Sequence, residues 1–259
     1  MLPDRQPTGV SRIVVLGASN LTRGFSTVVS TARLAWGPDI EVVAALGHGR
    51  SYGTRSVFLG RGLPGILESG LWRDLESRPP VPTRGFLTDV GNDIIYGFPP
   101  EQTLAWVGEA LGRLARVTSD ITVTDLPLDN IRRLSRPKFV ALRSILAPSC
   151  RLSLRQVQQT AERVNDGLVD LAAAHGARLV HLAPSWYGFD PIHIRPSQWR
   201  GAWQAILGNP PVTGWHDPAR VESIRLYLMP PERMWLCGIE RLTPQSGVRL
   251  TAGGVVWLY

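Results

Sequence analysis

Short hydrophobic runs rich in Val, Ile and Leu alternate along this chain with longer stretches of helical periodicity. Five runs have the length and the Gly, Pro or Asp boundaries of strands that are buried on both faces, namely 12–16, 40–46, 85–90, 121–126 and 177–183. Apolar residues at helical spacing fill 21–36, 100–117 and 154–175. This alternation predicts an α/β fold, a three-layer α/β/α sandwich around a doubly wound, mostly parallel sheet of five strands.

Two segments interrupt the alternation. Residues 129–148 carry several basic side chains and Pro137, and we expect a short helical insertion over an edge of the sheet. From about Pro210 the chain changes to short β-like runs between turns, at 224–228, 234–237, 248–250 and 255–258. We therefore expect an α/β domain over 1–209 and a small β-rich C-terminal extension over 210–259.

Composition excludes several classes of function. The net charge is +7, but Lys138 is the only lysine and no basic run is longer than Arg132-Arg133, so nucleic-acid binding is not expected. Cys150 and Cys237 are too few for a disulfide framework or a zinc site. The first residues lack the layout of a signal peptide and no apolar run has the length of a membrane span, so we expect a cytoplasmic protein. The oligomeric state stays open.

Four polar segments each follow a different predicted strand. They are Gly17-Ala18-Ser19-Asn20, Gly47-His48-Gly49, Gly91-Asn92-Asp93 and Asp190-Pro191-Ile192-His193. The carboxyl ends of parallel strands meet at one edge of an open α/β sheet, where ligands bind. We therefore expect the four segments to share one site.

The first three segments offer a nucleophile and donors for an oxyanion. Ser19 can attack a carbonyl carbon and can hold the resulting oxyanion with its own N–H, although Ser19 or Asn20 can also simply cap a helix. Either Gly47 or Gly49 can bring a main-chain N–H close to a ligand, unless the segment is an ordinary glycine-rich turn.

The uncharged amide of Asn92 is a further oxyanion donor, with a turn as the alternative role. Asp93 is interpreted as a helix cap, His48 as a loop residue that lines the pocket, and Asn20 as a further residue that lines it.

The fourth segment supplies a base. A histidine activates a serine hydroxyl by accepting its proton, and a carboxylate on the other ring nitrogen fixes the tautomer, so Asp190 and His193 fit these roles. The alternative is a surface Asp-Pro turn. Trp186, Tyr187 and Phe189 precede this pair, either as an aromatic wall of the pocket or as packing for the loop.

The ordered segments resemble the four sequence blocks of the SGNH hydrolases, the superfamily that includes the GDSL esterases and lipases. Over about 12–205, Ser19 matches the nucleophile, Gly49 the glycine donor, Asn92 the asparagine donor, and Asp190 and His193 the last block. The resemblance implies a flavodoxin-like fold. The aspartate that often precedes the serine is replaced by Ala18, and Val90 stands where the third block often has glycine, so the chain resembles a divergent member.

These observations predict a serine hydrolase that acts on carboxylic esters through an acyl-enzyme. One alternative keeps the same residues in an O-acyltransferase or a carbohydrate acetylesterase. A second alternative is a non-catalytic anion-binding protein of the same fold, suggested by the charge of +7. We expect a small-molecule or carbohydrate ester as substrate, and neither a cofactor nor a metal, because the sequence lacks metal-ligand spacing and a phosphate-binding loop.

Overall fold

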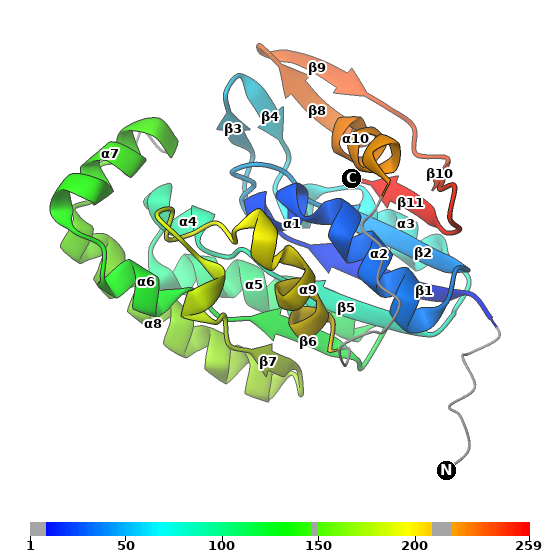
Figure 1. Cartoon of the computed structure of the whole chain (residues 1–259), viewed down its shortest axis with the longest axis horizontal. Helices are drawn as coiled ribbons and strands as arrows, with labels where there is room; N and C mark the ends of the chain where they lie inside the picture. Colours follow the sequence, from blue (N-terminus) through cyan, green and yellow to red (C-terminus); the bar gives the residue numbers. More distant parts are fainter. Residues whose placement is uncertain (1–8, 147–149, 209–218) are drawn as a thin grey trace.

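A computed structural model describes residues 9–146, 150–208 and 219–259. Its centre is a sheet in which the five predicted strands lie side by side and parallel (Figure 1). Their order across the sheet is β2, β1, β5, β6, β7. Their bounds are β1 Ser11–Leu16, β2 Ile40–Ala45, β5 Thr83–Leu87, β6 Ile121–Thr124 and β7 Arg178–Val180. The predicted mostly parallel α/β sheet is confirmed.

The sheet has seven strands rather than the predicted five. β11 (Val255–Leu258) pairs with β2 in parallel, and β10 (Val248–Arg249) pairs with β11 in the antiparallel direction. Both come from the C-terminal part of the chain. They cover the main-chain groups that β2 would otherwise leave unpaired at the edge of the sheet, and they bury Val256 and Leu258 in the core.

A second, smaller sheet combines distant parts of the sequence. It is antiparallel and contains, in order, β3 (Ser56–Phe58), β4 (Arg61–Leu63), β8 (Arg233–Leu236) and β9 (Ile239–Leu242). The C-terminal strands are thus divided between two sheets. The predicted domain boundary at 209–210 lies outside the described residues.

The prediction of a β-like run at 224–228 is wrong, because this segment lies in helix α10 (Arg220–Leu228). The physical reason is that the buried face of this helix includes a charged residue, so its helical periodicity is not visible as a pattern of apolar residues. Glu222 and Leu226 are four residues apart and are both buried, Leu226 with the core and Glu222 in an ion pair with Arg33 of α2 at 2.7 Å.

Helices cover both faces of the central sheet, as predicted. Alternate residues of β1 point to opposite sides: Ile13 packs in one core cluster and Val14 in the other. The first cluster lies under α2 (Phe25–Trp36), α9 (Trp199–Leu207) and α10, and the second under α3 (Leu71–Ser77), α5 (Pro100–Ala115) and α8 (Leu154–Ala174). None of the helices in the described ranges is long and apolar enough to cross a membrane.

The predicted helix at 21–36 is divided by Gly24 into α1 (Ser19–Arg23) and α2. A Cβ on Gly24 would lie 2.2 Å from Trp203 Nε1, so the glycine lets α9 pack closely at the junction. The expected insertion is present as α6 (Leu128–Arg132) and α7 (Arg136–Leu146), which project to one side of the molecule (Figure 1). The remaining short helices are α4 (Asn92–Ile95), η1 (Ile66–Glu68), η2 (Pro184–Trp186) and η3 (Pro196–Gln198).

Candidate active site

The four polar segments meet at the carboxyl edge of the central sheet. Ser19 is the first residue of α1, immediately after β1, and Asn92 is the first residue of α4, after β5. Gly49 follows β2, and His193 lies in the loop after β7. Because these strands are parallel, their following loops end on the same side, which is why residues so far apart in sequence share one site.

Ser19, His193 and Asp190 form a hydrogen-bonded chain. His193 Nε2 lies 2.9 Å from Ser19 Oγ, and His193 Nδ1 lies 2.6 Å from Asp190 Oδ2. The other carboxylate oxygen of Asp190 accepts the N–H groups of Ile192 at 3.1 Å and of His193 at 3.2 Å. Burial raises the pKa of Asp190, but the hydrogen bond and charge of His193 and these N–H groups outweigh it, so this pKa lies below its usual value.

Ser19, Gly49 and Asn92 line one groove and each offers an N–H donor. Among the described residues, the N–H groups of Ser19 and Gly49 donate to no acceptor, so both are available to a ligand. The amide of Asn92 donates one hydrogen to the Arg50 carbonyl at 3.3 Å, which orients the group and leaves its second hydrogen for a ligand. These are the donors that an oxyanion needs.

Gly49, but not Gly47, lines the groove that Ser19 lines. Gly49 has a φ of +65° and lines the groove that contains Ser19 and His193, and its carbonyl accepts a hydrogen bond from the Tyr96 hydroxyl. Gly47 lies instead against Leu63, where a Cβ would approach Leu63 Cδ1 to 2.0 Å. The glycine at position 47 is thus explained by packing, and the one at 49 by its left-handed backbone.

Asp89 is a site residue that the sequence did not reveal. It was expected inside a strand, but β5 ends at Leu87, and Asp89 has the left-handed φ of +61°. Its carboxylate accepts the N–H groups of Ala18 at 2.9 Å and of Leu21 at 3.0 Å, and so holds the turn that presents Ser19. A carboxylate within an otherwise apolar run was the available signal, because an unpaired charge is rarely buried in a strand.

Asn20 joins this turn to the histidine loop. Its amide donates to Asp89 Oδ1 at 2.8 Å and to the Ile192 carbonyl at 2.9 Å, and its oxygen accepts the Ile194 N–H at 2.8 Å. The expected role of Asn20 was only to line the pocket or cap a helix. These hydrogen bonds fix α1 relative to the loop that carries His193.

Asp93 is not a helix cap, because its side chain makes no capping hydrogen bond to α4. It points inward, is fully buried, and accepts the Tyr52 N–H at 3.0 Å. Burial raises the pKa of Asp93 to about 6. The Tyr52 hydroxyl in turn donates to the Thr88 carbonyl at 2.6 Å, which ties the glycine segment to the end of β5.

Two hollows share Ser19 in their lining. One is a pocket that is partly enclosed under α6 and α7, and the other is a wide groove between α1, β3, β4 and α10. Of the five residues predicted to line a pocket, Asn20 and Tyr187 line the enclosed pocket and His48 lines the groove. Trp186 is half-buried and packs against the core cluster under α2 and α9, and Phe189 is 79% exposed beside Lys138; neither lines the pocket or the groove.

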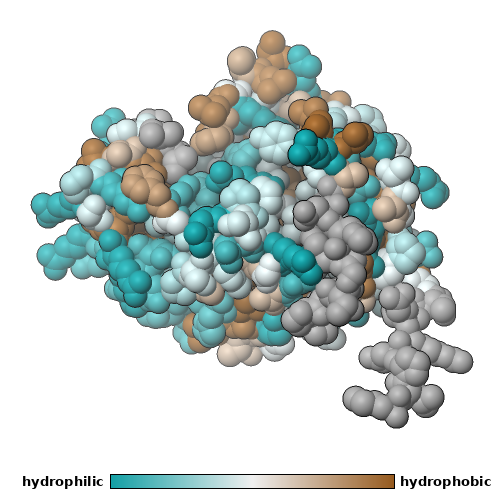
Figure 2. All heavy atoms as spheres, viewed as in Figure 1, coloured by the Kyte–Doolittle hydropathy of each residue, from teal (hydrophilic) through white to brown (hydrophobic). Residues whose placement is uncertain are grey.

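The rim of the groove is partly apolar. Figure 2 shows exposed apolar side chains over the β3–β4 hairpin and over α10, among them Leu59, Ile224, Tyr227 and Leu228. Within the described ranges, no three His, Cys, Asp or Glu side chains are arranged to hold a metal ion. Both cysteines are free thiols, with Cys150 buried and Cys237 exposed.

Comparisons with known proteins find similarity in structure but not in sequence. No family model matches the chain, and no curated protein matches its sequence. Among solved structures, Est24, a carbohydrate acetylesterase from Sinorhizobium meliloti, is 14% identical with a TM-score of 0.52, over 76% of this chain and 97% of that one. The aryl esterase of M. smegmatis is 13% identical with a TM-score of 0.52, over 76% and 96%. The chain therefore has an SGNH hydrolase-like fold, as the sequence blocks predicted.

Proposed function

We propose that this protein is a serine esterase that hydrolyses carboxylic esters through an acyl-enzyme. The observation that supports this most is the chain of hydrogen bonds from Asp190 through His193 to Ser19, at 2.6 and 2.9 Å. A serine hydroxyl is a weak nucleophile unless a neighbouring base accepts its proton, and this geometry supplies that base. The shared fold with a carbohydrate acetylesterase and an aryl esterase agrees with the proposal.

In the first half of the reaction, His193 Nε2 accepts the proton from Ser19 Oγ while Oγ forms a bond to the ester carbonyl carbon. Asp190 holds the ring by its Nδ1–H and stabilises the imidazolium that forms. The carbonyl oxygen becomes an oxyanion, which the N–H groups of Ser19 and Gly49 and the amide of Asn92 stabilise. The bond to the leaving alkoxide then breaks, and His193 gives the alkoxide its proton.

In the second half, water replaces the alcohol. His193 accepts a proton from the water, whose oxygen attacks the acyl carbon, and the same three donors hold the second oxyanion. The acid leaves as His193 returns the proton to Ser19 Oγ. Every step uses only groups of this chain and water.

The test is the hydrolysis of p-nitrophenyl acetate by wild type and by Ser19→Ala. We expect the variant to lose on the order of 10⁴-fold or more in kcat, the loss typical of a removed nucleophile. Ser144→Ala is the matched control, because Ser144 is exposed on α7 and only donates to the Val140 carbonyl at 2.8 Å. Equal turnover by wild type and Ser19→Ala would overturn the proposal.

An O-acyltransferase remains the second candidate, because the groove beside His193 is wide enough to admit an acceptor alcohol in place of water. The two reactions share the acyl-enzyme and differ in the second half. Product analysis with and without a sugar acceptor separates them: free acid in both cases means hydrolysis. A non-catalytic anion-binding protein would have no use for the alignment of His193 with Ser19.

A further inference from the structure

Ser19 lies at the boundary between two hollows that differ in chemistry. Ser19 and Asn92 line both the enclosed pocket and the groove. His193 and Asp190 line the groove but not the pocket. The attacking atom and one oxyanion donor are therefore shared, whereas the acid and base are found on one side only.

The position of His193 decides which part of an ester occupies each hollow. The histidine must protonate the leaving oxygen, and a general acid acts only within hydrogen-bond distance of the atom that it protonates. The leaving alcohol must therefore lie on the His193 side, in the groove. The acyl group is on the opposite side of the carbonyl carbon and enters the enclosed pocket.

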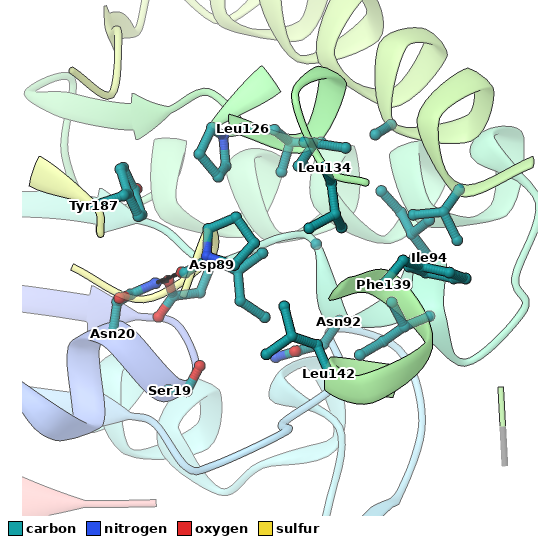
Figure 3. Close-up of a pocket in the computed structure, with 18 of the residues that line it drawn as sticks. Ser19, Asn20, Asp89, Asn92, Ile94, Leu126, Leu134, Phe139, Leu142 and Tyr187 are labelled. Carbon is teal, nitrogen blue, oxygen red and sulfur yellow. Dashed lines mark hydrogen bonds between the residues drawn. The ribbon is translucent and has the colours of Figure 1, made fainter. Parts of the chain in front are cut away.

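The enclosed pocket is suited to an apolar acyl chain. Its volume is about 130 Å³. Figure 3 shows the Ser19 side chain at its mouth and apolar side chains around its interior, from α4, from the loop after β6, and from the α6–α7 insertion. These include Ile94, Leu126, Leu134, Phe139 and Leu142. The helical insertion thus forms the acyl-binding wall.

The groove carries positive charge without a matching acid. Arg23 lies one helical turn after Ser19 on α1, and Arg61 lies on β4 across the groove from it; both line the groove. Neither forms an ion pair with a described residue, and Arg61 Nε is buried without a hydrogen-bond partner. Arg61 is half-buried whereas Arg23 is exposed at the edge of the groove. A half-buried guanidinium without a partner is costly, and carboxylate or phosphate is its preferred partner.

Arg23 and Arg61 line the same groove as His48. Burial lowers the pKa of His48, and the charges of Arg23, His193 and Arg61 lower it further. The nearby acids are already engaged, Asp190 with His193 and Asp89 with Asn20 and main-chain N–H groups. A negative group on the substrate would satisfy the two arginines.

We propose that the natural ester joins an apolar acyl group, held in the pocket under α6 and α7, to a leaving alcohol that carries a carboxylate or phosphate bound by Arg23 and Arg61. This inference rests on the proposed esterase function. It specifies the class of substrate on both sides of the scissile bond.

The anionic half is tested with butyryl esters of three phenols: 4-hydroxybenzoate, 4-hydroxyphenyl phosphate, and the neutral methyl 4-hydroxybenzoate. We expect kcat/KM for at least one anionic ester to exceed that of the neutral ester by about tenfold or more, and the better anion identifies the group. Arg23→Gln and Arg61→Gln should each lower this ratio by about tenfold, as expected for a lost bond to a charged group. Arg116→Gln, an exposed arginine that lines neither hollow, should leave the ratio unchanged.

The acyl half is tested with p-nitrophenyl acetate, butyrate and hexanoate. Burial of each methylene should raise kcat/KM by about fourfold until the pocket is full. Leu142→Trp narrows the pocket from α7 and should shift the preference to acetate. Val140→Trp is the matched control on the same helix, because Val140 is 50% exposed and lies outside the pocket.

The outcomes separate this inference from the function on which it rests. Ser19-dependent hydrolysis with no preference for the anionic esters, or a preference that both arginine variants retain, would overturn the inference and leave the esterase intact. A chain-length profile that Leu142→Trp and Val140→Trp alter equally would overturn the acyl assignment. Absence of any Ser19-dependent hydrolysis would overturn the function and the inference together.

Discussion

Replacement of Asn20 by alanine tests how much the hydrogen bonds of this side chain contribute to stability and to kcat. The side chain makes hydrogen bonds to Asp89 at 2.8 Å, to the Ile192 carbonyl at 2.9 Å and from the Ile194 N–H at 2.8 Å. A neutral hydrogen bond contributes about 0.5–1.5 kcal/mol and one to a charged group about 1.5–3 kcal/mol. Asn20→Ala should therefore lower the free energy of unfolding by about 3 kcal/mol, taking the lower values because the residue is half-buried.

The effect on catalysis should be larger than a loss of stability alone explains. Asn20 joins the turn of Ser19 to the loop of His193. If these two residues are the proposed nucleophile and base, a displacement of about 1 Å between them can cost on the order of 100-fold in rate. We expect kcat for p-nitrophenyl acetate to fall by about that factor, with a smaller change in KM, because the residues that line the groove remain.

Gln245→Ala is the matched control. Gln245 also makes three hydrogen bonds with the main chain, to Pro230 at 3.2 Å, to Thr243 at 3.1 Å and from Leu258 at 3.0 Å, but it lines neither hollow. Urea unfolding should show a loss of about 2 kcal/mol for this variant, with kcat/KM unchanged. The positioning role of Asn20 is refuted if Asn20→Ala loses stability and keeps the wild-type kcat.

Three further predictions follow from burial, packing and chemistry. Asp93 has a pKa of about 6 when folded against an ordinary 3.8, so the folded state loses about 2 kcal/mol as the pH rises from 4 to 7. Urea unfolding should find Asp93→Asn more stable than wild type at pH 7 and equal to it at pH 4. Gly24→Ala should lower the free energy of unfolding by about 1–3 kcal/mol through collision with Trp203, whereas Gly201→Ala in α9, where a Cβ meets nothing within 4 Å, should raise it by about 0.5–1 kcal/mol. Incubation with EDTA should leave ester hydrolysis unchanged, because the proposed steps use only groups of the chain and water; a loss that added metal restores would contradict them.

The sequence predicted those parts of the site that depend on local pattern. Buried strands are visible in the sequence as apolar runs, and parallel strands direct their carboxyl ends to one edge of the sheet. The sequence alone therefore predicted that Ser19, Asn92 and His193 lie in one site. The three-residue spacing of Asp190 and His193 also predicted their contact, which the structure shows at 2.6 Å. The catalytic roles of these residues stay predictions until they are assayed.

The features of the fold that the sequence did not predict depend on contacts between segments that are distant in the chain. The break at Gly24 is explained only by Trp203 of α9, and the burial of Glu222 only by Arg33 of α2. β11 has the pattern of any short strand, and its place beside β2 follows from the need to cover an open edge. No local pattern reports such partners, which is why the strand count and α10 were not predicted.

Asp89 and Asn20 show the same limit within the site. Each belongs to a segment whose neighbours were recognised, yet their roles lie in hydrogen bonds that connect α1, the end of β5 and the histidine loop. A side chain that positions another residue contributes no reacting atom, so its residue type alone does not reveal its positioning role. The structure was needed to distinguish Asn20 from a simple helix cap and Asp89 from a residue of a strand.

The reaction of the protein with a fluorophosphonate, followed by peptide mass mapping, tests the central claim most directly. An activated serine attacks this reagent, whereas an ordinary serine does not. We expect a single label on Ser19, and labelling at least 100-fold slower in His193→Ala, because the base that activates the serine is then absent. An unlabelled protein, or a label on Ser19 that forms equally fast without His193, would contradict the account.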